Sequence, residues 1–280
     1  MKKEAIKDKY IVNGVLTSTK NEEIFEQITK APIYEVIRVI NGVPLFFEEH
    51  LDRMRKSSEI VDYEILRDDK EIKNDVKILI KENDVENLNI KLLCTDIEGK
   101  GQVFLAYFIE SYYPDAKVYK EGIHTILYHY ERQNPNAKVL NVSFKEDVNR
   151  RIKEEEAFEA LLVNGEGYIT EGSRSNMFFV KGTTAYTAPK GEVLLGVTRN
   201  HIMDVCMKLN IKVIEERIHI EDLGKIDGAF MTGTSVNALP ITTIDDRKYN
   251  SVDNSIIKEV GKGYMESIKK YLEEKKAQWE

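Results

Sequence analysis

The sequence predicts an α+β protein in two lobes, and two kinds of pattern lead to that prediction. Asn-Gly pairs at 13–14 and 41–42 each lie between apolar runs, which is the strongest short-range signal for a β-hairpin. A further strand–turn–strand pattern surrounds Glu171, between the apolar runs 160–163 and 177–180. Hairpins in both halves argue against a doubly wound dinucleotide-binding fold.

The first lobe is expected to span residues 1–111. Apolar residues at helical spacing predict helices over 47–61 and 70–82, and apolar runs predict strands over 88–94 and 103–111.

The second lobe is expected to span residues 120–280, after a linker at 112–119 that contains a proline, an acidic residue and an alanine. Thr198 is the expected N-cap of a helix. Strands are predicted over 123–129, 212–216 and 228–232, and helices over 144–157, 198–209 and 252–273.

The bulk composition excludes several classes of protein. With 41 basic and 48 acidic residues the 280-residue chain has a net charge of −7, which gives no electrostatic support for a nucleic-acid partner. No signal-peptide core and no run of about 18 apolar residues occurs, so no membrane partner is expected. Cys94 and Cys206 lie in apolar contexts and are expected to be buried thiols, which suits a cytoplasmic protein. The five histidines show no metal-binding spacing, so no metal site is predicted.

Glu171 places a carboxylate at the mouth of a tight turn between two apolar strands. The flanking residues draw this turn toward a core, so the carboxylate needs a cationic or N–H partner to offset its desolvation. If the chain does not supply that partner, a bound ligand can.

Lys138 precedes this block, in Asn136-Ala-Lys-Val-Leu-Asn141, with no acidic residue within three positions on either side. A lysine among small and apolar residues loses its proton easily and can act as an amine nucleophile. Lys145 and Lys153 are alternatives, but both fall in an acid-rich helix that would keep an ammonium group charged.

Together these two segments resemble the class IV, fold-type IV pyridoxal-phosphate aminotransferases, a family that includes branched-chain and D-amino-acid aminotransferases and aminodeoxychorismate lyase. The match is to K-x-L-N at 138–141 and to G-x-x-x-E-G-S-x-S-N-x-F at 167–178. The resemblance extends from the hairpin at 13–14 to the turn at 233. It implies a two-lobe fold-type IV structure with pyridoxal 5'-phosphate between the lobes, and a homodimer whose partner helps to close each site.

The resemblance also implies roles for single residues. Lys138 corresponds to the lysine that binds the cofactor covalently, and Glu171 to the acid that keeps its pyridine nitrogen protonated. Tyr34 matches a tyrosine of the substrate pocket, although a core aromatic residue is an equally good interpretation. The expected phosphate-binding residues are Arg53, in His50-Leu-Asp-Arg-Met54, Val197 and Thr198 where a helix begins, and Gly233 and Thr234 after a strand.

The chain departs from the family pattern where a substrate carboxylate would bind. D-amino-acid aminotransferases are expected to have an arginine and a histidine after the strand that matches 88–94, whereas this chain offers only Lys100 as a point charge. Branched-chain members carry a tyrosine five residues after the lysine and a G-x-G-E-N block; here Ser143 and 173–176 stand in those places. Arg174, beside Glu171, could face either the pocket or the solvent.

The sequence therefore predicts a pyridoxal-phosphate-dependent transaminase that transfers an amino group between an amino acid and a 2-oxo acid. Two alternatives keep the same site: an aminodeoxychorismate lyase that releases pyruvate and 4-aminobenzoate, and a catalytically impaired cofactor-binding protein. A globular α+β protein with chance matches is a further interpretation, which a colourless and phosphate-free preparation would support.

Overall fold

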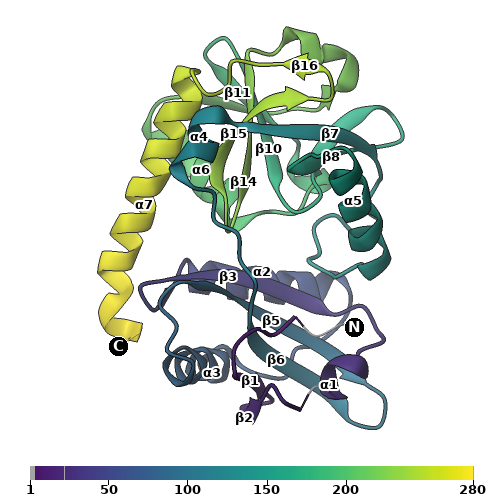
Figure 1. Cartoon of the computed structure of the whole chain (residues 1–280), viewed down its shortest axis with the longest axis vertical. Helices are drawn as coiled ribbons and strands as arrows, with labels where there is room; N and C mark the ends of the chain where they lie inside the picture. The colour runs from purple at the N-terminus through teal and green to yellow at the C-terminus, as the bar shows by residue number, and fades with distance from the viewer. Residues whose placement is uncertain (1–3, 22, 280) are drawn as a thin grey trace. The chain divides into compact units, whose positions relative to one another are not determined.

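The computed structural model describes residues 4–21 and 23–279, and it has the α+β architecture that the sequence predicts. Its internal contacts divide the chain into two compact units, each described below by itself (Figure 1). The segment that contains Lys138 and the end of the last helix group with the first unit. The first unit comprises 1–112, 137–142 and 269–280, and the second comprises 113–136 and 143–268.

The first unit contains a six-stranded antiparallel sheet in the order β2-β1-β6-β5-β3-β4. Both predicted Asn-Gly hairpins are confirmed. Asn13 and Gly14 have φ values of 48° and 84°, as a tight turn with two left-handed residues requires. The strands are β1 (Lys9–Val12), β2 (Val15–Ser18), β3 (Ile33–Ile40), β4 (Val43–Pro44), β5 (Leu88–Ile97) and β6 (Gly101–Ile109).

Helices α2 (Phe47–Ile60) and α3 (Asp69–Glu82) lie within two residues of their predicted bounds, and a short α1 (Glu23–Glu26) was not predicted. The amphipathic faces of α2 and α3 pack on the sheet and form one core with it. That core includes Leu51 and Met54 of α2 and Val76 and Leu79 of α3.

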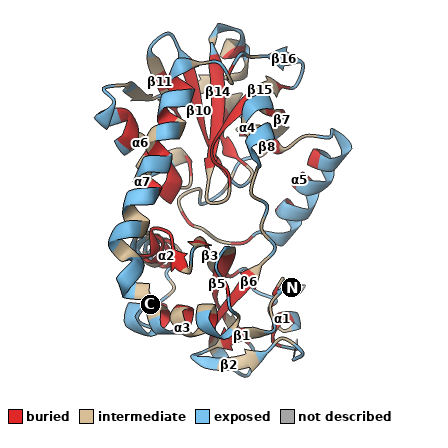
Figure 2. Ribbon diagram, turned by 60° about the vertical axis from the view of Figure 1, so that its left-hand side comes forward, coloured by how far each residue is buried: buried red, intermediate tan, exposed pale blue. Residues whose placement is uncertain are grey.

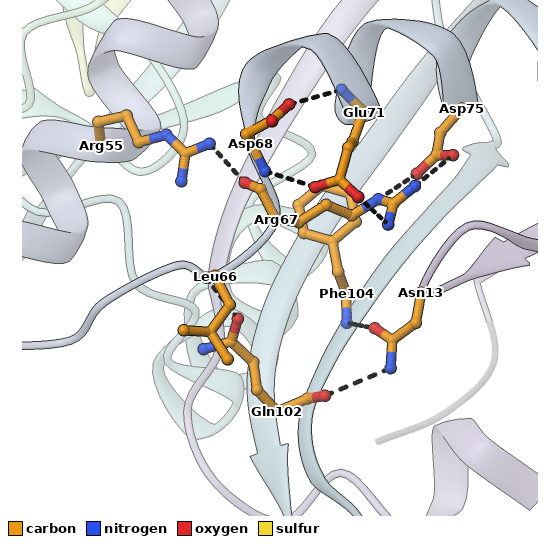
Figure 3. Close-up of polar contacts among 9 residues, drawn as sticks. All are labelled: Asn13, Arg55, Leu66, Arg67, Asp68, Glu71, Asp75, Gln102 and Phe104. Carbon is orange, nitrogen blue, oxygen red and sulfur yellow. Dashed lines mark hydrogen bonds and ion pairs between the residues drawn. The ribbon is translucent and has the colours of Figure 1, made fainter.

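The loop between α2 and α3 is fixed by charged side chains (Figure 3). Arg55 donates to the carbonyl oxygens of Ile65 and Arg67 at 2.9 and 2.6 Å. Arg67 forms two hydrogen bonds to the buried carboxylate of Asp75, at 2.5 and 2.7 Å. Asp68 caps α3 through a reciprocal pair of hydrogen bonds with the N3 residue of that helix. The loop is therefore tied to both helices by side-chain hydrogen bonds.

The second unit contains a mixed sheet in the order β12-β11-β10-β14-β15-β7-β8-β9-β13, with β16 paired to β15. Buried residues concentrate on its strands, whereas α5 and α7 each keep an exposed face (Figure 2). The strands are β7 (Ile123–His129), β8 (Glu159–Val163), β9 (Tyr168–Gly172), β10 (Asn176–Lys181), β11 (Thr184–Thr187), β12 (Lys212–Glu215), β13 (Ile218–His219), β14 (Gly228–Gly233), β15 (Asn237–Ile244) and β16 (Arg247–Lys248).

A short helix that was not predicted, α4 (Ala116–Glu121), begins within the expected linker, and the Asp115 carboxylate accepts hydrogen bonds from two N–H groups of its first turn. Two helical predictions need correction. Thr198 is not an N-cap, because α6 (Val197–Lys208) begins one residue earlier and Gly196 is its N-cap. The last helix, α7 (Ser255–Trp279), continues beyond residue 273. The remaining helices are α5 (Val142–Glu154) and two 3₁₀ turns, η1 (Lys190–Glu192) and η2 (Ile220–Lys225).

Both cysteines are free and buried, as expected. Burial raises the pKa of the Cys94 thiol to about 12 and that of the Cys206 thiol to about 11. Within residues 4–21 and 23–279, no helix has both the length and the apolar character needed to cross a membrane.

Candidate active site

Lys138 is held by its main chain in the first unit. Its N–H donates to Ser57 Oγ at 3.1 Å, and its carbonyl oxygen accepts from the N–H of Tyr34 at 3.1 Å. The next residue, Val139, forms an isolated antiparallel bridge with Ile33 of β3. The Lys138 amine lies 4.8 Å from the centroid of the Tyr34 ring. The structure thus brings together two of the residues that the sequence predicted for the site.

Arg53 lies on α2, where its guanidinium faces a buried carboxylate of β3. Its Nε and Nη2 donate to Glu35 at 2.7 and 2.6 Å. His50 Nδ1 lies 2.8 Å from the same carboxylate. Because an ionised carboxylate only accepts hydrogen bonds, that nitrogen carries the proton in the neutral ring. The pairing fixes the plane and direction of the Arg53 guanidinium.

Opposing effects set the pKa values of this cluster. Burial by itself raises the pKa of Glu35, but the charge and hydrogen bonds of Arg53, together with His50, outweigh it and hold the pKa well below the ordinary value. Burial lowers the pKa of His50; the neighbouring Glu35 partly offsets this effect, and the positive charges of Arg53 and Lys138 add to it. At neutral pH the cluster therefore contains an anion, a cation and a neutral imidazole.

A second cation lies near Tyr34. Lys91 of β5 is buried, is paired with Glu4, and has its amine 5.1 Å from the centroid of the Tyr34 ring. Two ammonium-forming groups, Lys91 and Lys138, are thus within about 5 Å of one aromatic ring. Lys100, the point charge suggested by the sequence, is exposed in the turn between β5 and β6.

Glu171 lies on β9 of the second unit and is 3% exposed. The chain places a cation and an N–H group beside its buried carboxylate, and the contact of Oε1 with the cation is an ion pair without hydrogen-bond geometry. Oε1 is 2.8 Å from Nε of Arg132, and Oε2 accepts from the N–H of Leu194 at 3.1 Å. Arg132 also donates to the carbonyl oxygen of Ser173 at 2.9 Å, and its guanidinium lies 5.4 Å from the ring centroid of Phe144. The carboxylate is therefore held in one orientation.

The turn after Glu171 is organised by a second buried carboxylate, Glu159 of β8. Glu159 accepts from the hydroxyl groups of Ser173 and Ser175 at 2.5 and 2.9 Å and from the N–H of Ser173 at 3.1 Å. Arg174, between the two serines, is 60% exposed at its side chain and donates to the carbonyl oxygen of Phe158. Arg174 therefore lies at the surface of its unit.

The segment that leads into α6 is fixed by amide side chains. Asn176 Nδ2 donates to the carbonyl oxygen of Leu194 at 2.7 Å, and Asn136 Nδ2 donates to the carbonyl oxygens of Lys190 and Val193 at 2.7 and 2.6 Å. Val197 and Thr198 are buried in the first turn of α6, directly after this segment. Its N-cap, Gly196, has no side chain to accept from the first N–H groups of the helix.

Gly233 ends β14 and Thr234 follows it, at the edge where Asn176 begins β10. Thr232 pairs with Asn176, and Gly233 pairs with Asn237 across the next turn. Within the second unit, the structure therefore joins the Gly233 turn to the strand that follows the Glu171 block.

Several polar residues of these clusters were not singled out from the sequence: Glu4, Glu35, Lys91, Arg132 and Glu159. For one of them, Glu35, the local sequence does indicate a buried position. Glu35 alternates with Ile33, Ile37 and Val39 on the buried side of β3, so an acidic residue there requires a buried partner. The others are brought to the site by pairings distant in sequence.

Each unit by itself offers groups that suit a phosphate-bearing aldehyde cofactor. The first unit offers the Lys138 amine and an oriented arginine, and the second unit offers a held carboxylate and a helix N-terminus that begins at a glycine. A Cβ at Gly196 would collide with Asn176 Oδ1, so the backbone must approach closely there. The described residues contain no cluster of three or more His, Cys, Asp or Glu side chains that could bind a metal ion.

The same fold is found in solved class IV enzymes. The branched-chain amino acid aminotransferase of T.th., solved with pyridoxamine 5'-phosphate, superposes with a TM-score of 0.85 at 21% identity, over 96% of each chain. The enzyme of the same description from Escherichia coli gives a TM-score of 0.81 at 20% identity, over 94% of this chain and 95% of that chain. These similarities show the fold-type IV architecture that the sequence predicted.

Sequence comparison identifies the family. The family described as Amino-transferase class IV matches residues 32–244. A D-alanine aminotransferase of Bacillus licheniformis is 28% identical over 255 residues, which cover 82% of this chain and 89% of the relative. A branched-chain-amino-acid aminotransferase of Pseudomonas aeruginosa is 27% identical over 235 residues, which cover 77% and 76%. The chain belongs to the class IV aminotransferases, and it is a pyridoxal-phosphate-dependent transaminase as the sequence predicted.

Proposed function

We propose that Lys138 is the residue through which this transaminase binds its cofactor, pyridoxal 5'-phosphate. The observation that carries the proposal is the position of its amine, 4.8 Å from the Tyr34 ring, on a main chain held by hydrogen bonds on both sides. When bound, the cofactor withdraws electrons from the substrate Cα. The Lys138 amine holds the aldehyde carbon between turnovers and moves the proton at the substrate Cα during them.

Three further roles belong to the same proposal. Glu171 keeps the pyridine nitrogen protonated, which its fixed orientation between Arg132 and Leu194 supports. Tyr34 lines the substrate pocket beside the lysine. The cofactor phosphate is held by Arg53, by Val197 and Thr198 at the start of α6, and by Gly233 and Thr234 at the end of β14.

The substrates are an amino acid and a 2-oxo acid, as the names of the relatives suggest. Lys91 is a better candidate than Lys100 for the group nearest to a substrate carboxylate. Its amine is buried and lies near the same Tyr34 ring as the Lys138 amine. Two lobes at 1–111 and 120–280, a homodimer and a cytoplasmic location remain predictions from the sequence. Sedimentation analysis of the purified protein tests the homodimer.

A trapping experiment tests the proposal. Borohydride reduction of the holoenzyme fixes the cofactor to its lysine, and digestion followed by mass spectrometry locates the label. The expected result is a single labelled peptide that contains Lys138, and loss of the visible absorption band in Lys138→Ala. A label on Lys145 or Lys153, or an unchanged band in the variant, would refute the assignment. Steady pyruvate release without an amino acceptor would instead support a lyase.

A further inference from the structure

We infer that the Ser57 hydroxyl is a positioning residue for Lys138, an inference that rests on the proposed role of that lysine. Ser57 is on α2, is 0% exposed, and accepts the hydrogen bond from the Lys138 N–H at 3.1 Å. Its own proton is donated to the carbonyl oxygen of Arg53 at 2.8 Å. One buried hydroxyl thus connects the main chains of the proposed cofactor lysine and the proposed phosphate arginine.

The main chain around Lys138 is attached to β3 and to the loop before it. It has no regular secondary structure between residues 131 and 141 apart from the single bridge of Val139. Its hydrogen bonds to β3 and the preceding loop come from Tyr34 N–H to the Lys138 carbonyl oxygen and from Leu140 N–H to the Pro32 carbonyl oxygen. The Ser57 contact is on the other peptide group of Lys138. It therefore fixes the Cα position, and with it the distance that the amine can reach.

The adjacent Ser58 provides a matched control. It is also buried, at 5% exposure, and its hydroxyl donates to a carbonyl oxygen of its own helix, that of Arg55, at 2.7 Å. Removal of either hydroxyl loses one hydrogen bond within the helix and creates a similar small void. Only removal of the Ser57 hydroxyl takes away the acceptor of the Lys138 N–H. A difference between the two variants therefore reports on the lysine rather than on the helix.

The experiment compares Ser57→Ala and Ser58→Ala with the wild type. Measurements are the melting temperature of the apoenzyme, the dissociation constant of pyridoxal 5'-phosphate, and kcat and KM for one amino donor. We expect similar losses of melting temperature in both variants. Ser57→Ala should raise the cofactor dissociation constant by about tenfold and lower kcat with little change of KM, because the partly buried N–H of Lys138 loses its acceptor. Ser58→Ala should keep the cofactor dissociation constant and kcat within about twofold of the wild type.

Equal cofactor affinity and kcat in the two variants, whether unchanged or reduced together, would overturn the inference. If Ser57→Ala does not fold, Ser57→Cys leaves no void and replaces the hydroxyl with a weak acceptor. It should weaken cofactor binding in the same direction, and wild-type affinity in that variant would also overturn the inference. Failure of the underlying assignment would be seen separately, as a wild-type enzyme whose borohydride label is not on Lys138.

Discussion

Glu35 is a carboxylate without solvent exposure in the middle of an apolar strand, and it is tolerated only because Arg53 and His50 satisfy it. Replacing a buried ion pair by apolar groups can be neutral, but removing one partner leaves the other charge unpaired. The cluster therefore couples stability to the orientation of the arginine proposed to bind phosphate.

Glu35→Gln should lower stability at pH 7 by about 3 kcal/mol, the usual cost of breaking a buried pair. The pKa of Glu35 is lower in the folded protein than in the unfolded chain, so the folded state binds fewer protons in acid. The stability from this group is complete above the ordinary carboxyl pKa and is lost as the pH falls below it. The variant should show a flatter decline of unfolding free energy between about pH 5 and pH 2.

Urea unfolding at a series of pH values measures both effects. The matched control is Glu121→Gln, which removes an exposed carboxylate that is 3.8 Å from the Lys117 amine. This control should follow the wild-type curve at every pH. A Glu35→Gln curve parallel to that of the wild type would contradict the assigned protonation states.

Glu171→Gln should leave the cofactor bound but slow removal of the substrate Cα proton by on the order of 10²-fold, because a neutral amide does not hold the pyridine nitrogen protonated. The side chain keeps its shape and can still accept from the Leu194 N–H. Single-turnover spectra with an amino donor measure the step directly. The control is Glu166→Gln. Glu166 is an exposed acid on the same hairpin as Glu171 and pairs with Arg217, and its variant should behave as the wild type. Full turnover in Glu171→Gln would show that the ring nitrogen has another partner.

At the scale of elements, the sequence correctly predicted those helices, strands and turns that depend on neighbouring residues alone. The Asn-Gly hairpins, the helices α2 and α3 and the strands on both sides of Glu171 follow from turn chemistry and apolar spacing. The start of α6 was misplaced by one residue because a glycine N-cap has no side chain, so Thr198 had the stronger local signal. β15 was not predicted, and it pairs with β7 from more than a hundred positions away.

The residues of the candidate site divide in the same way, into those that lie in local motifs and those that are paired across long sequence distances. Lys138, Glu171 and the start of α6 lie in continuous motifs, and a family resemblance points to them directly. The pairs Glu4–Lys91, Arg132–Glu171 and Glu159 with the two serines join residues from separate strands and loops. No local pattern encodes such a pair, since each partner by itself is an ordinary charged or polar residue. Their roles follow only from the register of the sheets.

The segment before α6 gives a prediction at this scale. Gly196→Ala should weaken binding of pyridoxal 5'-phosphate by about tenfold or more, because the added Cβ collides with Asn176 Oδ1 and displaces the first turn of the helix. Gly191→Ala is the matched control in the same segment, since a Cβ there meets nothing within 4 Å. Titration of each apoenzyme with the cofactor provides the comparison. Equal affinities in the two variants would mean that the start of α6 does not hold the phosphate.

At the scale of the whole molecule, the long helix α7 contributes to both compact units, since its residues up to 268 group with the second unit and the rest with the first. Its last turns pack on the beginning of α2. Tyr271 accepts from the Phe47 N–H at 3.0 Å and donates to Glu48 at 2.8 Å. The ring of Trp279 lies 4.9 Å from that of Phe47. The end of the chain therefore contributes to the core of a unit whose other main segment ends at residue 112.

Trp279→Ala should destabilise the first unit by about 2 kcal/mol, less than for a fully buried tryptophan because this side chain is partly exposed. The variant loses the edge contact with Phe47 and the packing beneath the Lys73 amine, which lies 5.3 Å from the ring centroid. Hydrogen exchange measures the effect locally: protection should fall in α2 and α3 and remain unchanged in β8 and β10. Lys270→Ala, an exposed position on the same helix, should leave every segment protected as in the wild type. Uniform loss of protection across both sheets in Trp279→Ala would show instead that the two units unfold as one.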